Sequence, residues 1–306
     1  MGGQPDLTTR VGSVALPTAV MTAAGTAGHA DELGGYVDLA ALGAHVVKSL
    51  HADPWPGNPG PRVTAAGAGM LNAIGLQGPG VRAWLSEALP RLAGVRVVAS
   101  IWGRSVEDYR RAADLLAGSG VVAVEVNLSC PNLEGRRGIF AHDATLSAEV
   151  IAATAGCGVP RWAKLSANTD RVIEVAAAVA EAGAEAVTLV NTLLGMVIDP
   201  ATMRPALAAG GGGYSGTPIH PVAVRAVFDV HAALPALPII GVGGVCDGWT
   251  AAEMIAAGAC AVQVGTASFA DPRAVQRVTA GLRRWMRRAG VSSVDALRGV
   301  AHDQEQ

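Results

Sequence analysis

The chain has 306 residues, half of them hydrophobic and 16% charged, with a formal net charge of −2 at pH 7. This is enough apolar sequence for a large core, and the near-neutral charge argues against a basic surface that binds nucleic acid or anionic membranes. The polar start and the lack of an apolar run of about 20 residues predict a protein that is neither secreted nor membrane-spanning. Four widely spaced cysteines without a CxxC pair support neither a disulfide framework nor a metal cluster, which fits a reducing cytoplasm.

A short apolar run followed by a helix-like segment recurs along the chain. The runs predict eight strands, at residues 18–25, 45–50, 95–102, 121–129, 161–167, 185–191, 237–244 and 259–266. Between the later strands, apolar residues recur every three or four positions, which predicts helices at 106–120, 143–156, 170–184, 220–234 and 248–259. Strands that are apolar throughout and alternate with helices indicate a parallel sheet with a covered outer face.

Eight such units favour an α/β fold of the TIM (β/α)8 barrel type, formed by residues 1–306 as a single domain. The alternative is an open Rossmann-like sheet, against which the absence of a GxGxxG motif after the first strand argues. Two connections, at 51–94 and 198–218, are much longer than ordinary βα loops. Both leave the carboxyl ends of strands, the face on which barrels build active sites, so we expect both insertions to be functional.

Polar residues close several of the predicted strands, namely Lys48, Ser100, Asn127, Lys164, Asn191 and Thr192. Any one of them could be structural, but two lysines and two asparagines that converge on one face favour a ligand site, because burying unpaired polar groups is costly. The last two strands end in Gly243–Gly244 and Gly265–Thr266. Either pair alone would indicate only a tight turn. Together they predict phosphate binding through backbone N–H groups.

Cys130 follows the fourth strand and is a candidate for proton chemistry, since a thiol becomes a base where its surroundings favour the thiolate. The other three cysteines, Cys157, Cys246 and Cys260, are expected to be small buried apolar residues. The seven histidines form no metal-ligand pattern, and His51 and Asp53 near the barrel mouth are only a weak indication of function.

Six motifs resemble those of the dihydroorotate dehydrogenase family: NLSCPN (127–132), GMLNAIGLQGPG (69–80), VNTLLGM (190–196), GGYSGTPIHP (212–221), PIIGVGG (238–244) and AVQVGT (261–266). The resemblance implies an FMN-binding TIM barrel that oxidises dihydroorotate to orotate in pyrimidine biosynthesis. Cys130 matches the base of the cytosolic class 1 enzymes, and the motifs are most similar to the NAD-linked catalytic subunit. That form has a homodimeric core and a partner subunit with FAD and a [2Fe–2S] cluster.

The resemblance also implies roles for individual residues. Cys130 would remove the C5 proton of the substrate, and residues 131–142 would form a lid that carries this base. Substrate-binding positions are Lys48, Asn72, Ala73, Ile74, Gly75, Leu76, Asn127, Asn191 and Thr192. Cofactor-binding positions are Ala24, Lys48, Ser49, Ser100, Asn127, Lys164, Val190, Gly216, Gly243, Gly244, Gly265 and Thr266.

Four residues depart from the family pattern: Ala24 replaces Ser, Ser100 replaces Asn, Gly78 replaces Asn and Ala167 replaces Pro. The first two would change contacts to the flavin. Three alternatives stay open at this point. The fumarate-linked homodimer of class 1A would fit the same cysteines. A flavin-dependent reductase similar to dihydropyrimidine dehydrogenase shares NLSCP, although Asn132 argues for orotate. A barrel without catalysis would not need Cys130 or the two lysines.

Overall fold

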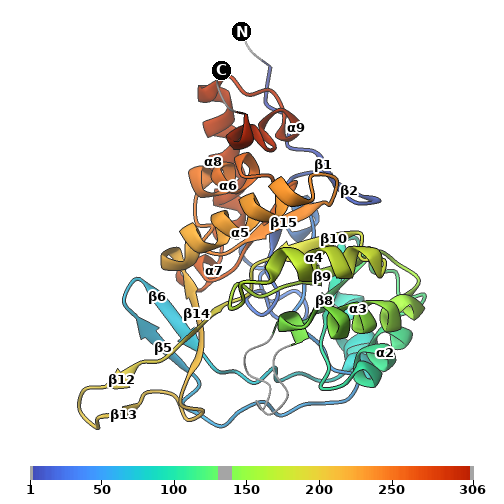
Figure 1. Ribbon diagram of the computed structural model, residues 1–306, viewed down its shortest axis with the longest axis vertical. Helices are drawn as coiled ribbons and strands as arrows, with labels where there is room; N and C mark the ends of the chain where they lie inside the picture. The colour runs from blue at the N-terminus through green and yellow to red at the C-terminus, as the bar shows by residue number, and fades with distance from the viewer. Residues whose placement is uncertain (1–2, 130–139, 304–306) are drawn as a thin grey trace.

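The computed structural model describes residues 3–129 and 140–303, and its core is a parallel sheet of eight strands rolled into a barrel (Figure 1). The strands in spatial order are β3 (Val20–Thr22), β16 (Ala261–Val264), β15 (Ile239–Val242), β10 (Ala186–Leu189), β9 (Arg161–Lys164), β8 (Ala123–Asn127), β7 (Val97–Ile101) and β4 (His45–Val46).

Backbone hydrogen bonds close the barrel between its two end strands. The Thr22 N–H donates to Ala44 O at 3.3 Å, and the Gly43 N–H donates to Val20 O at 2.9 Å. The TIM barrel prediction is therefore confirmed, and the open-sheet alternative is wrong. All eight predicted strands are present, each shorter than the apolar run that predicted it.

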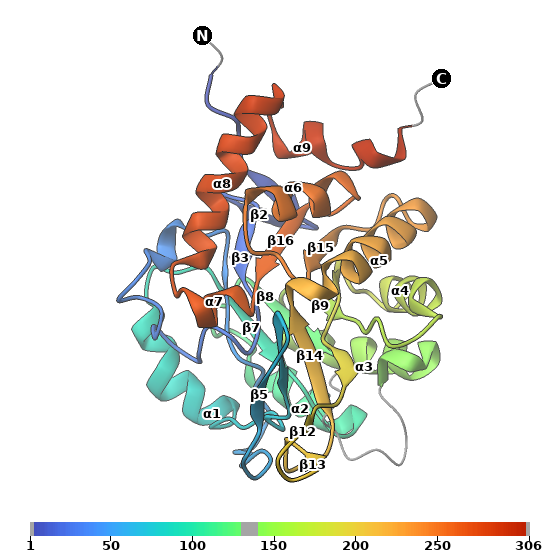
Figure 2. The ribbon, with the colours of Figure 1, turned by 90° about the vertical axis from the view of Figure 1, so that its left-hand side faces the viewer.

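Helices cover the outside of the barrel (Figure 2). The longer ones are α2 (Val106–Leu115), α3 (Ala144–Ala153), α4 (Val172–Glu181), α5 (His220–Ala233), α6 (Gly248–Ala256) and α8 (Ala274–Ala289). Shorter pieces are α1 (Val81–Ala83), η2 (Trp84–Ala88), η3 (Leu89–Leu92), α7 (Ala267–Ala270) and α9 (Val294–Leu297), with single turns at η1 (Leu39–Ala41), η4 (Phe140–His142), η5 (Thr154–Cys157), η6 (Thr217–Ile219) and η7 (Val300–His302).

Local sequence explains where the main helices begin and end. The side chains of Ser105, Asp143 and Asp247 accept N–H bonds as the N-caps of α2, α3 and α6. Gly290 ends α8 in the left-handed conformation that glycine adopts without strain. The five helices predicted from the sequence are all confirmed. None of the described helices combines the length and apolar character that crossing a bilayer requires.

The barrel interior is built in layers, because every second residue of a strand points inward and alternate strands contribute to one layer. The strand register gives a top layer of Lys48, Asn127, Val190 and Gly265, then Ala23, Ser100, Lys164 and Val242, then Val46, Glu125, Thr188 and Gln263. Lower down the core is apolar. The hairpin of β1 (Thr9–Val11) and β2 (Val14–Leu16) packs there against Met21 and Trp162.

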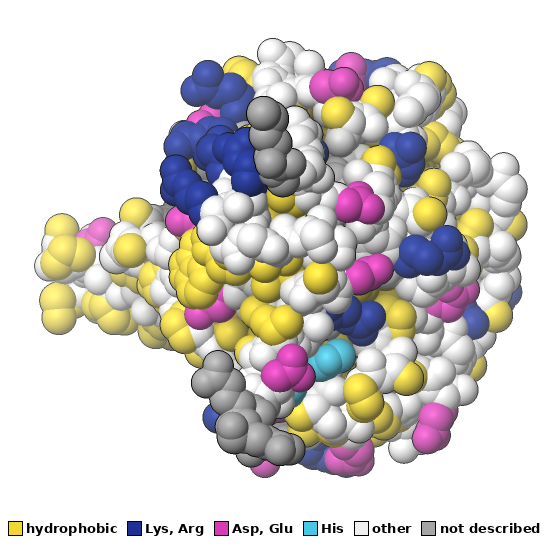
Figure 3. Space-filling model, turned by 90° about the horizontal axis from the view of Figure 1, so that it is seen from above, with side chains coloured by type: hydrophobic (Ala, Val, Ile, Leu, Met, Phe, Trp, Pro, Cys, Tyr) yellow, Lys and Arg dark blue, Asp and Glu magenta, His cyan; other side chains and the backbone are white. Residues whose placement is uncertain are grey.

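The two long insertions meet above the carboxyl ends of the strands. They form an antiparallel sheet in the order β11 (Leu193–Gly195), β14 (Gly212–Gly216), β6 (Gly69–Asn72) and β5 (Val63–Ala66). A hairpin of β12 (Ile198–Asp199) and β13 (Arg204–Pro205) projects from the body and exposes Met196, Ile198 and Met203 (Figure 3). The sequence predicted where the insertions leave the barrel but not that they pair with each other.

Candidate active site

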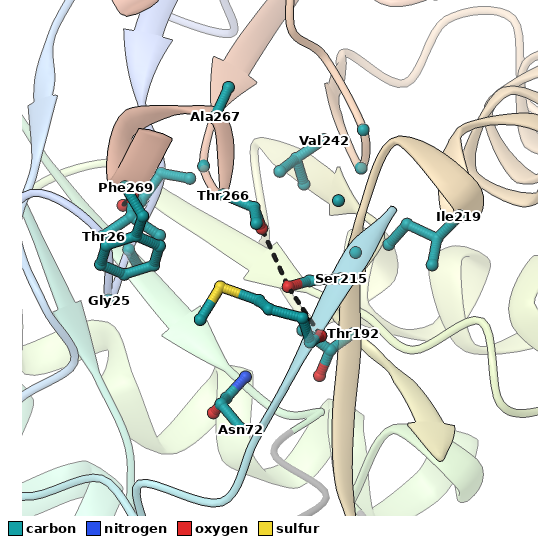
Figure 4. Close-up of a pocket in the computed structure, with 18 of the residues that line it drawn as sticks. Gly25, Thr26, Asn72, Thr192, Ser215, Ile219, Val242, Thr266, Ala267 and Phe269 are labelled. Atoms are coloured by element: carbon teal, nitrogen blue, oxygen red, sulfur yellow. Dashed lines mark hydrogen bonds between the residues drawn. The ribbon is translucent and has the colours of Figure 1, made fainter. Parts of the chain in front are cut away.

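A cavity of about 1000 Å³ lies between the strand ends and the insertion sheet (Figure 4). The strand ends contribute Ala24, Lys48, Asn127, Lys164, Val190, Asn191, Thr192, Val242, Gly243, Gly244, Gly265 and Thr266. The insertions contribute Asn72, Ile74, Leu76, Ser215 and Gly216, so the side chains that the sequence places in distant segments share one space.

Amide side chains order one end of the cavity. The Asn191 Nδ2 donates to Ser129 Oγ at 2.9 Å and lies 3.2 Å from Asn127 Oδ1. On the helix side of the strand, the Tyr109 hydroxyl donates a hydrogen bond to Asn127 O at 2.7 Å. These bonds hold the end of β8 in place up to Ser129, which is fully buried. Cys130 and residues 131–139 of the expected lid lie outside the described residues, and 140–142 form η4.

Lys48 brings an unpaired positive charge to the same end. Within residues 3–129 and 140–303, its ammonium makes no hydrogen bond or ion pair. Burial lowers the pKa of Lys48, and the positive charge of Arg62 lowers it further. A desolvated ammonium without a partner favours an anionic ligand, because such a ligand would supply the missing counter-charge.

Lys164 belongs to the second layer and reaches the cavity from below. Only 7% of its side chain is exposed, and its Nζ lies 3.8 Å from Glu125 Oε1. The lysine thus places a second cation against the cavity, on the side opposite the insertion sheet. A negative charge that develops above Lys164 would be stabilised there.

Glycines shape the far end of the cavity. Gly244 has a φ of +68°, and a Cβ on it would lie 2.6 Å from the Cβ of His220. Thr266 Oγ1 donates to Ser215 Oγ at 2.9 Å, which joins the end of β16 to the insertion sheet (Figure 4). In the described part of the chain, the N–H groups of Gly244 and Thr266 have no hydrogen-bond partner. Free backbone N–H groups at the ends of β15 and β16 are suited to bind a phosphate.

Three predicted site residues lie behind the cavity lining. Ala73 is fully buried, Gly75 adopts a φ of +70°, and the Ser100 hydroxyl lies 2.8 Å from that of Ser49. Ser49 itself does reach the cavity. Cys157 and Cys260 are buried, as expected. Cys246 is only half-buried and lines the cavity, and burial raises the pKa of its thiol.

The sequence reasoning missed several residues of this region. Ser215, Arg62 and Thr26 line the cavity, and Asn168 hydrogen-bonds to Thr192 O at 3.0 Å. Ser215 lies inside the motif GGYSGTPIHP (212–221), from which it could have been predicted. Glu125 lies within the fourth strand as a charged residue in an apolar run, which is itself an indication that it has a partner.

The four departures from the family pattern lie in different surroundings. Ala24 lines the cavity, and Ser100 is bonded to Ser49 beneath it. Gly78 lies beside His29, where a Cβ would approach Nε2 to 3.3 Å. Ala167 packs against the outer core. Ala24 therefore bears on the cavity directly, and Ser100 does so only through Ser49.

A closed (β/α)8 barrel with cations, amides and backbone N–H groups around one cavity is the architecture of a TIM-barrel enzyme, and these groups are suited to an anionic ligand beside a phosphate-bearing one. The family model for dihydroorotate dehydrogenase matches residues 6–286. The chain belongs to the dihydroorotate dehydrogenase family.

Relatives match over almost their whole length. A protein from Pelobacter propionicus, named dihydroorotate dehydrogenase B (NAD(+)), catalytic subunit, is 43% identical over 301 residues, which cover 97% of this chain and 99% of the relative. A protein of the same name from Desulforudis audaxviator is 44% identical over 296 residues, covering 95% and 96%. A relative from Solibacter usitatus, provisionally named as the fumarate-linked A form, is 42% identical over 300 residues, covering 97% and 98%.

Proposed function

We propose that the protein oxidises dihydroorotate to orotate in pyrimidine biosynthesis, as the FMN-binding catalytic subunit of an NAD-linked dihydroorotate dehydrogenase. The observation that carries this proposal is the cavity. At one end it has several amides and a Lys48 ammonium that is unpaired among the described residues, and at the other it has backbone N–H groups that are free among the same residues. The names of the relatives from Pelobacter and Desulforudis support the same activity.

The cavity residues fit FMN. The free N–H groups of Gly244 and Thr266 are suited to its phosphate, and Lys164 is suited to the end of the ring system that becomes negative on reduction. The volume of about 1000 Å³ leaves room for a small substrate beside the flavin. When bound, FMN supplies the acceptor for the hydride that leaves C6 of dihydroorotate.

The chain's own residues would bind the substrate and move its proton. Lys48 would pair with the substrate carboxylate, and Asn72, Asn127 and Asn191 would offer donors and acceptors to the pyrimidine ring. Cys130 is the proposed base for the C5 proton. It directly follows Ser129, whose position Asn191 holds. Thr192 and the insertion residues Ile74 and Leu76 would close the site against water.

The same proposal includes the setting of the enzyme. We place it in the cytoplasm as one FMN-binding domain, in a homodimeric core that passes electrons to a partner subunit with FAD and a [2Fe–2S] cluster. The words "catalytic subunit" in the relatives' names support such a partner. The fumarate-linked form is the second candidate, because the Solibacter relative carries that provisional name.

Flavin reduction tests the activity. Purified protein reconstituted with FMN is expected to be yellow, and dihydroorotate is expected to bleach the flavin without oxygen. Bleaching by dihydrouracil but not by dihydroorotate would favour the dihydropyrimidine dehydrogenase-like alternative. Protein that neither binds FMN nor reacts with either compound would refute the proposal.

An acceptor assay separates the two dihydroorotate dehydrogenase forms. Turnover with NAD⁺ is expected only after the FAD and [2Fe–2S] subunit is added, with little turnover on fumarate. Rapid turnover of the chain alone with fumarate would instead assign it to the fumarate-linked form.

A further inference from the structure

Directly beneath the cavity floor, the barrel contains a polar layer where such barrels usually carry aliphatic side chains. Glu125, Thr188 and Gln263 are each fully buried in this layer. The Thr188 hydroxyl donates to Glu125 Oε2 at 3.1 Å, and Gln263 Nε2 donates to the same oxygen at 2.7 Å. The layer therefore centres on one carboxylate that has no access to solvent.

The second oxygen of this carboxylate faces Lys164. Glu125 Oε1 has no hydrogen-bond partner among the described residues, and it lies 3.8 Å from Lys164 Nζ. Two donors on Oε2 and an ammonium near Oε1 are the surroundings that an ionised carboxylate requires, since it can only accept. Neither charge would be stable alone at this depth, because an unpaired buried charge carries a large desolvation penalty.

We propose that Glu125 is a positioning residue that keeps the Lys164 ammonium charged and directed at the cavity floor. Thr188 and Gln263 hold the carboxylate from the opposite side, so that Oε1 is left for the lysine. The proposal rests on the proposed function in one respect, namely that FMN is the group that Lys164 faces. The pairing itself is a property of the chain without cofactor.

No other carboxylate in the described ranges takes this place. Among the described residues, Glu125 from β8 is the carboxylate at ion-pair distance from Lys164. The other charged residues that line the cavity are the cations Lys48, Arg62 and Arg277 and the carboxylate Asp271, which is already paired with Arg273 and Arg277. The partners from β10 and β16, Thr188 and Gln263, are uncharged. Removing the Glu125 charge would therefore leave the buried Lys164 ammonium without a carboxylate at ion-pair distance in the described part of the chain.

The pH dependence of stability tests the pairing without cofactor or substrate. In Glu125→Gln, the folded state holds the Lys164 ammonium without a counter-charge, whereas water solvates it in the unfolded state. A buried unpaired ammonium costs stability only while it carries its proton, so the stability of the variant should rise as pH rises into the alkaline range. We expect its unfolding midpoint to lie roughly 5–15 °C below that of the wild type at neutral pH, and the gap to narrow as pH approaches about 10.

Two further variants separate charge pairing from packing. Adding Lys164→Met to Glu125→Gln should recover much of the lost midpoint and remove the pH dependence, because no unpaired charge remains. The matched control Thr188→Val removes one hydrogen bond to the same carboxylate but keeps the ion pair, so its gap to the wild type should be constant with pH. The proposal would be overturned if the unfolding midpoint of Glu125→Gln stayed below that of the wild type by the same amount at every pH and if adding Lys164→Met did not raise it.

Two other outcomes are also decisive. If Glu125→Gln does not fold, recovery of folded protein by Lys164→Met supports the pairing, and failure of both variants to fold contradicts it. FMN titration provides the link to the cavity. Measured from pH 6 to pH 9, the FMN affinity of Glu125→Gln should fall to roughly one tenth of the wild-type affinity as pH rises. Wild-type protein that binds no FMN would refute the proposed function but leave the stability test valid.

Discussion

The Asn191 Nδ2 lies 2.9 Å from the Ser129 Oγ, so a residue at the end of β10 holds the residue that precedes Cys130. Asn191 also contacts Asn127 and lines the cavity. One amide thus couples the substrate end of the cavity to the segment that carries the proposed base.

Asn191→Ala is expected to slow flavin reduction by dihydroorotate about 100-fold, because it removes at least two hydrogen bonds of about tenfold each. Stopped-flow absorbance of the FMN-loaded protein measures this rate. The control Asn168→Ala also removes a bond to the segment after β10 but does not line the cavity, so we expect a loss below about fivefold. A near-wild-type rate for Asn191→Ala would contradict the role.

Orotate binding should depend on the protonation of Lys48. Burial and the charge of Arg62 lower the pKa of Lys48, so the ammonium loses its proton at a lower pH than an exposed lysine does. Orotate affinity, measured by the change in flavin absorbance, should therefore fall towards alkaline pH.

Two variants test this assignment to Lys48. Lys48→Met should bind orotate weakly and without this pH dependence. Arg62→Gln should move the loss of affinity to higher pH, because it removes a charge that lowers the pKa of Lys48. An unchanged midpoint in Arg62→Gln together with a normal profile in Lys48→Met would assign the dependence to another group.

Gly244→Ala should destabilise the protein and weaken FMN binding. The left-handed φ of +68° disfavours a side chain, and the new Cβ would lie 2.6 Å from that of His220. We expect a loss of about 2–4 kcal/mol in the free energy of unfolding, measured in urea. Gly265→Ala is the matched control, since its Cβ would meet Ala23 at an ordinary 3.4 Å and the fold should be retained.

Stability should decrease in mild acid through His29. Burial and the nearby Lys48 charge lower the pKa of His29 from 6.5 to about 4. The folded state therefore binds fewer protons than the unfolded state, and stability that is full above pH 6.5 is lost as pH falls towards 4. The loss should reach about 2 kcal/mol for this residue.

A urea titration across this pH range measures the effect. His29→Gln should remove part of the pH dependence and not all of it, because burial also lowers the pKa of His45. A full wild-type dependence in His29→Gln would assign the effect to His45 and other groups.

The strand pattern and most of the polar strand ends could be read from the chain alone. An apolar run and the polar residue that closes it are contiguous, so Lys48, Asn127, Lys164 and Asn191 could be placed at one barrel face from strand direction alone. The glycines after the last two strands followed from the same rule. The motifs around them were sufficient to indicate the family that the comparisons confirm.

Contacts between distant segments could not be predicted in this way. Asn72 pairs in register with Gly213 across the two insertions, and Gln263 reaches Glu125 over 138 positions of sequence. Ser100 was expected to touch the flavin, yet it lies behind Ser49. No local pattern specifies such contacts, since they arise only when closure of the barrel brings inward-facing side chains into common layers. The pairing of a buried carboxylate with Lys164 is the clearest case. Each group is charged in water without a partner, and each needs the other only once both are buried.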